Sequence, residues 1–73
     1  MVMSNRMLLD AIDRLRENGL VLALFRSGRM CVADGYDAHG NLIISARGET
    51  RREALFGLVS RVRFQRPELL DAG

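Results

Sequence analysis

Apolar residues near the start of the chain recur at the spacing of one helix face. The members of this stripe are Met7, Leu8, Ala11, Ile12 and Leu15. Ser4 precedes the stripe and offers a hydroxyl for an N-cap. Asn18-Gly19 follows it, and a glycine there can take the left-handed conformation that ends many helices. The pattern predicts an amphipathic helix over residues 5–18.

Three short apolar stretches follow, and each is bounded by turn-forming residues. They cover residues 20–25, 30–33 and 42–44. Each is too short for a typical helix, so we interpret them as strands. Ser27-Gly28 predicts a hairpin turn, Asp34-Gly35 a bulge or bend, and the polar run 37–41 a further turn.

The stretch from residue 51 to residue 66 carries two conflicting patterns. Thr50 and Glu53 have the spacing of a capping box, which favours a helix. Against a helix, Gly57 costs about 1 kcal/mol in a helix interior. Val62 and Phe64 also alternate with polar residues, as in a strand. We favour two strands with a bend near Gly57, and the alternative is a helix from Thr50 to Val62.

The elements together predict a single domain over residues 1–73. It would contain one helix at about 5–18, about five short strands over 20–66, and a frayed tail at 68–73. Short strands with close turns favour a mainly β fold, a bent antiparallel sheet or small open barrel. The alternative fold is an αβββα domain of the α+β class.

The chain is short for a self-sufficient core. Its 73 residues and 48% apolar content are typical of one globular domain. A chain of this size buries roughly 60% of its unfolded surface, which is near the lower limit for independent stability. Cys31 is the only cysteine, so no intrachain disulfide can help. We therefore expect the protein to form a homo-oligomer.

Several classes of protein are excluded by the same sequence. No run without a charged residue comes near the roughly 20 residues that span a bilayer. The N-terminus has no long apolar segment of a secretory signal. A lone thiol and no targeting segment predict a cytoplasmic protein without a membrane partner.

All eleven basic residues are arginines, and the formal net charge is +2. The arginines are concentrated between residues 47 and 66, which is a weak indication of an anionic partner. We expect Arg14 and Arg16 on the helix, and Arg61 and Arg63 on one face of the last strand, to follow a phosphate backbone.

The sequence gives little support for catalysis, a metal or a cofactor. Cys31 lies in an apolar strand and His39 in a turn, so a nucleophilic Cys-His pair is not indicated. Asp34, Asp37 and His39 are turn-forming residues without a second cluster to complete a metal site. No glycine spacing matches a phosphate-binding loop. We predict a protein that is not an enzyme and holds no cofactor.

Three stretches resemble the Sm-like family and its bacterial branch, the Hfq RNA chaperones. The run Asp37-Ala38-His39-Gly40-Asn41-Leu42 is similar to the Asp-x-x-x-Asn-Leu signature of the first Sm motif. The closing stretch, residues 58–67, resembles the last two Hfq strands, with a Ser bend and a final Arg66-Pro67. The helix core at residues 9–12 also resembles that of Hfq.

The resemblance implies a five-stranded bent sheet capped by the helix. It implies a ring of five to seven subunits, joined edge strand to edge strand, that binds single-stranded RNA and acts in post-transcriptional regulation. His39 and Asn41 would contact bases near the pore, and Asp37 would hold the loop.

One departure from the Hfq pattern supports a second functional hypothesis. Where Hfq proteins carry a Lys-His pair that serves the uridine pocket, this chain has Phe56-Gly57. The alternative function is therefore a ring-forming structural or protein-interaction module, such as a phage or regulatory protein, that does not bind RNA.

Overall fold

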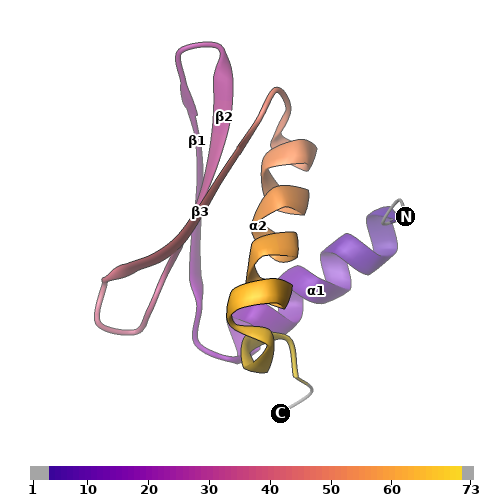
Figure 1. Cartoon of the computed structure of the whole chain (residues 1–73), viewed down its shortest axis with the longest axis vertical. Coiled ribbons are helices and arrows are strands. Elements are labelled where there is room, and N and C mark those ends of the chain that lie inside the picture. Colours follow the sequence, from indigo (N-terminus) through magenta and orange to yellow (C-terminus); the bar gives the residue numbers. More distant parts are fainter. Residues whose placement is uncertain (1–3, 72–73) are drawn as a thin grey trace.

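A three-stranded antiparallel sheet lies against two helices that cover the same face (Figure 1). The computed structural model describes residues 4–71. The elements follow one another in a simple order along the chain. They are α1 (Asn5–Glu17), β1 (Val21–Ser27), β2 (Met30–Tyr36), β3 (Leu42–Gly48), α2 (Arg51–Gln65) and the 3-10 turn η1 (Pro67–Leu70).

The expected five-stranded sheet or barrel is wrong. The sheet has three strands in the order β1-β2-β3, and the residues assigned to the last two strands form α2 instead. The two α-helices hold 28 of the 73 residues. The fold is therefore the αβββα arrangement that the sequence left as the alternative.

The first helix forms as its residue pattern indicates. The Ser4 hydroxyl accepts a hydrogen bond from the Met7 N–H at 3.2 Å, so Ser4 is the N-cap. The chain leaves the helix through Gly19 at φ +91°, a conformation that other residues rarely adopt. Leu8, Ala11, Ile12 and Leu15 are buried, and they place α1 against the core.

Strand pairing sorts the side chains of the sheet onto two faces. The pairing of Leu24, Ala33 and Ala46 places one cross-strand row on the inner face, under the helices. The rows on either side belong to the outer face, because side chains alternate along a strand. Gly28, at φ +63°, makes the hairpin turn, and the register shifts between Gly35 and Tyr36.

The second helix begins at a capping box in which the returning bond reaches the residue before the N-cap, Glu49, instead of Thr50. The Thr50 hydroxyl accepts a hydrogen bond from the Glu53 N–H at 3.1 Å, and the Glu53 carboxylate accepts one from the Glu49 N–H at 2.9 Å. Gly57 is tolerated because α2 lies very close to the sheet there. A Cβ at Gly57 would stand 3.3 Å from the Ala46 Cβ, so the glycine permits tight packing of helix on strand.

The start of α2 also requires a glycine in the preceding strand. A Cβ at Gly48 would lie 2.5 Å from the Glu53 Cβ and 2.6 Å from the Ala54 backbone nitrogen. The backbone nitrogen cannot move away without disturbing the first turn of the helix. Gly48 therefore sets how closely β3 and α2 can meet.

Part of the tail that was expected to be frayed forms a helical turn that packs on the fold. Residues 67–70 form η1, and Leu69 and Leu70 pack against the core. The Asn18 side-chain amide donates to the carbonyls of Leu69 and Asp71 at 2.8 and 2.9 Å. These bonds tie the tail to the end of α1. Residues 72–73 lie outside the described part of the chain.

The contacts of Gly48 lead to a stability prediction. Gly48→Ala should destabilise the fold by about 2–3 kcal/mol, as overpacking against backbone does, which urea unfolding would measure. Gly57→Ala is the matched control. Its helix propensity gain of about 1 kcal/mol offsets the tight contact with Ala46, so it should stay within about 1 kcal/mol of wild type. Equal stability of both variants would contradict this account of the junction.

Candidate functional site

One end of the molecule gathers arginines from two parts of the chain that are distant in sequence. Figure 1 shows the β1–β2 hairpin turn and the start of α2 at the same end of the fold. Arg29 lies in the hairpin turn and Arg26 lies in β1 just before it, and Arg51 and Arg52 open α2. All four side chains are exposed. We call these four residues the basic end.

Strand register explains why the two pairs of arginines come together. Arg26 pairs with Cys31, and Cys31 pairs with Gly48, so Arg26 and Gly48 share an inner-face row. Two strand spacings separate them, or about 10 Å. The helix starts three residues after Gly48. Arg52 is further fixed by its Nε, which donates to the Asn5 side-chain oxygen at 2.6 Å and connects α2 to α1.

The basic end holds the whole net charge of the protein. Its four arginines have only Glu49 and Glu53 beside them in sequence, which leaves a net charge of +2. The remaining seven arginines are matched by seven carboxylates, so the rest of the chain is neutral. Glu53 is also occupied by its capping hydrogen bond. The charge is therefore concentrated at one end instead of spread over the surface.

The opposite end of the sheet holds His39 and Asn41, two of the predicted RNA-contacting residues. Both are exposed in the β2–β3 turn. Asp37 organises this turn: one carboxylate oxygen accepts hydrogen bonds from the His39 and Asn41 N–H groups, each at 2.9 Å. These bonds, led by that from Asn41, hold the pKa of Asp37 below its usual value. Asp37 holds the loop, as the sequence predicted.

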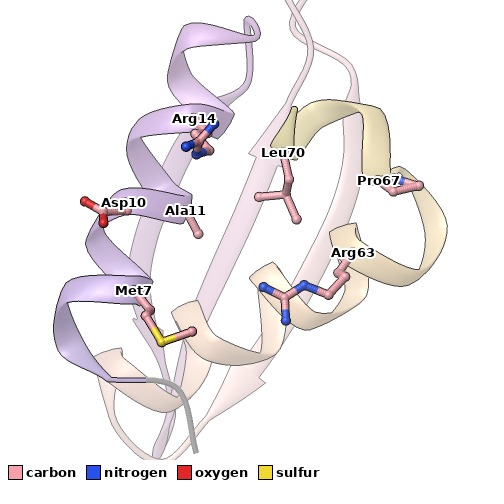
Figure 2. Close-up of a pocket in the computed structure, with 7 residues that line it drawn as sticks. All are labelled: Met7, Asp10, Ala11, Arg14, Arg63, Pro67 and Leu70. Atoms are coloured by element: carbon pink, nitrogen blue, oxygen red, sulfur yellow. The ribbon is translucent and has the colours of Figure 1, made fainter. Parts of the chain in front are cut away.

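Two of the four predicted phosphate-contacting arginines meet at a groove. Arg14 and Arg63 both line a space of about 340 Å³ between α1, the end of α2 and η1. Figure 2 shows Arg63 extending from α2 towards α1, with Leu70 and Ala11 turned into the space and Asp10 turned away. Most of the lining is apolar. The residues that line it are Met7, Asp10, Ala11, Arg14, Arg63, Pro67 and Leu70.

The other two predicted arginines do not join that groove. Arg16 lies in the last turn of α1, and Arg61 is exposed on α2. Arg61 and Arg63 were expected on one strand face, but on a helix residues two apart point about 200° away from each other. The six residues selected from the sequence therefore lie in several separate places. Arg66 is occupied by an ion pair with Glu68 at 2.8 Å, which lowers the pKa of Glu68.

A second polar cluster lies on the outer face of the sheet. Asp34, in the central strand, is buried with only 8% of its surface exposed. Its carboxylate accepts hydrogen bonds from the Ser45 hydroxyl at 2.6 Å and the Tyr36 hydroxyl at 3.3 Å. Partial burial and the neighbouring Asp34 charge raise the pKa of Tyr36. Both partners of the carboxylate are neutral.

The residues weighed for nucleophilic or metal chemistry do not converge. Cys31 is buried at the hairpin end of β2, whereas His39 lies beyond its other end. Within residues 4–71, no three His, Cys, Asp or Glu side chains gather closely enough to hold a metal ion. None of the helices described for this stretch is long and apolar enough to cross a membrane.

Sequence reasoning did not select the arginines of the basic end. Arg51 and Arg52 belong to the basic stretch between residues 47 and 66, whereas Arg26 and Arg29 lie outside it. The sequence does contain a local indication of a basic site, because Arg26-Ser27-Gly28-Arg29 places two cations at a hairpin turn. Its connection with α2 depends on the fold.

Comparison of the chain with protein-family models, curated proteins and solved structures gives no match. The resemblance to the Sm-like family therefore stays a hypothesis drawn from short motifs. Any functional conclusion has to come from the geometry of the chain itself.

The hydrogen bonds to Asp37 lead to a pH prediction. Because its folded pKa is lowered, Asp37 contributes stability above its unfolded pKa of about 3.9, and this stability is lost as pH falls through the lower folded value. Asp37→Asn should remove that part of the acid sensitivity. NMR titration of the carboxyl and urea unfolding between about pH 2 and pH 6 would measure both effects. A folded pKa at or above 3.9 would contradict the prediction.

Proposed function

We propose that this domain binds RNA by its sugar-phosphate backbone at the basic end and performs no catalysis. The observation that carries the proposal is the convergence of Arg26, Arg29, Arg51 and Arg52, together with the whole net charge, at one end of the fold. Arginine forks bind phosphate oxygens in a bidentate way. Neutralising phosphates is the main source of affinity for nucleic acids.

The form of RNA is inferred from the positions of the aromatic side chains. Single-stranded RNA is usually held by stacking its bases on aromatic rings. Phe25 and Tyr36 belong to the outer face of the sheet, Phe56 is half-buried, and Phe64 lies near the far end of α2. Phe25, which is next to Arg26 in β1, belongs to the opposite face of the sheet from Arg26. Paired RNA, which proteins bind by shape and backbone contacts, is therefore the better fit.

The projecting hairpin turn supports paired RNA further. A-form RNA has a wide, shallow minor groove that displays 2′-hydroxyls and phosphates. A two-residue turn, Gly28 and Arg29, is narrow enough to enter such a groove. Arg51 and Arg52 would then meet phosphates from the first turn of α2, where the positive end of the helix dipole also favours anions.

The edge-to-edge ring is not part of this proposal. It rested on a five-stranded sheet, and the protein has three strands. A cytoplasmic location remains part of the proposal, supported by the single buried thiol of Cys31, which has no disulfide partner. The alternative function, a protein-interaction module, is favoured by a separate observation on the outer sheet face, described in the next subsection.

Removing one arginine of the basic end should weaken RNA binding about tenfold at low salt, since a charge-assisted hydrogen bond contributes about 1.5 kcal/mol. Fluorescence anisotropy with a short RNA duplex would measure this for Arg29→Ala and Arg51→Ala. Each change should also reduce the slope of log K against log salt by about 0.9. The affinity for the RNA duplex would be compared with the affinities for A-rich and U-rich single strands and for a DNA duplex.

Arg16→Ala and Arg61→Ala are the matched controls, because each removes the same charge at a distance from the basic end. Arg61 lies ten residues along α2 from Arg51, or about 15 Å. If the four variants weaken binding equally, the basic end is not the site. If no RNA binds at low salt, the proposed function is wrong.

A further inference from the structure

The outer face of the sheet has no helix or loop of residues 4–71 packed on it. Both helices lie on the inner side (Figure 1). The outer rows carry apolar side chains that are left in solvent: Val21, Phe25 and Leu42 are 58%, 48% and 54% exposed. Val32 is buried within this face yet belongs to no part of the helix-covered core.

The face also carries one anion and one cation that lack charged partners. Within residues 4–71, the Asp34 carboxylate is bound only by neutral hydroxyls. The Arg47 guanidinium, one row closer to the hairpin end, makes no hydrogen bond or ion pair there. A nearly buried carboxylate is costly unless a cation compensates it. An arginine arriving from outside would supply that cation.

The accessible surface of the molecule is larger than expected for its mass, as it should be if one face of the sheet is uncovered. The accessible surface is 5,069 Å², whereas a monomer of this mass exposes roughly 4,500 Å². Three strands of seven residues present a projected area of roughly 340 Å² per copy. This area is smaller than the half-interface of about 800 Å² in a stable dimer.

We propose that two copies of this chain associate face to face through their outer sheet surfaces, with Arg47 of each copy pairing with Asp34 of the other. A two-fold interface requires a self-complementary surface. This face meets the requirement because it bears one unpaired charge of each sign among apolar residues. Its small area makes the dimer weak and dependent on concentration.

Strand register defines how the two copies fit. Phe25, Val32 and Arg47 share one outer row, and Ala23, Asp34 and Ser45 share the next. The two copies would be related by a two-fold axis that lies between the sheets, at right angles to the strands and midway between these two rows. The strands of the two copies then run in opposite directions. The Phe25 row of one copy lies over the Ala23 row of the other. Arg47 then lies within one strand spacing of Asp34, and the large Phe25 ring covers the small Ala23.

Sedimentation velocity over a range from about 10 µM to about 1 mM would test the proposal, because these concentrations cover the dissociation constants of weak complexes. Wild type should shift from monomer to dimer. Arg47→Glu and Phe25→Glu should each raise the dimer dissociation constant at least tenfold. Arg16→Glu and Phe64→Glu are matched controls, since both residues are exposed on helices, and they should leave it unchanged.

A double variant tests the charge pair itself. If Asp34 contacts Arg47 of the other copy, Asp34→Asn should weaken the dimer and remove most of the additional effect of Arg47→Glu. Circular dichroism of each variant checks that it folds. If Asp34→Asn does not fold, the Arg47→Glu and Phe25→Glu results decide alone.

Two outcomes would overturn the proposal. One is a wild-type protein that stays monomeric over the whole range, which would leave the face to a different protein. The other is a dimer that responds equally to face and control variants, which would place the contact at the sheet edges or the helices. RNA binding is measured separately on the basic end, so failure of the dimer leaves the proposed function standing.

Discussion

The close contact between α2 and the sheet is the constraint on which the other features depend. It exists because side chains are missing or small where the helix crosses the strands: Gly57 lies over Ala46, and Gly48 lies beneath Glu53. A helix this close to β3 and β2 covers only one face of the sheet. Its first turn is then brought beside the hairpin, which creates the basic end, and no helix or loop of residues 4–71 covers the outer face.

The first half of the fold could be predicted because its signals are local. Ser4, the apolar stripe of α1 and Gly19 all act within a few residues, and the same holds for the Gly28 turn and the Asp37 loop. Each of these signals acts between residues that are close together in the sequence, so it can be read without the rest of the fold. Predictions of this kind depend little on tertiary structure.

The second helix could not be assigned with the same ease, because its local signals conflict. The capping box at Thr50 indicated a helix correctly. Gly57 argued against one, but its cost is offset by packing against Ala46, a residue eleven positions earlier in the chain. Phe64 suggested the buried side of a strand, yet it is 90% exposed. The packing of Gly57 and the exposure of Phe64 are therefore the reasons why the sequence pattern favoured strands over a helix.

The candidate site was harder to predict than the fold because it depends on that helix. Arg26 and Arg51 are 25 positions apart, and they share one end only if α2 begins directly after β3. Under the five-strand interpretation, Arg61 and Arg63 would have shared a face instead. The five-strand interpretation therefore places the expected phosphate contacts near the end of α2, whereas the basic end includes the start of this helix.

The basic end and the outer face are separate surfaces, so RNA binding and self-association are compatible. Arg47 belongs to the outer face and is not needed at the basic end. In the antiparallel stack the two basic ends point in opposite directions, so their charges do not repel each other across the interface. Four arginines alone give a modest, salt-sensitive affinity. A dimer offers a second such end, and a duplex or assembly that engages both gains from the increased effective concentration.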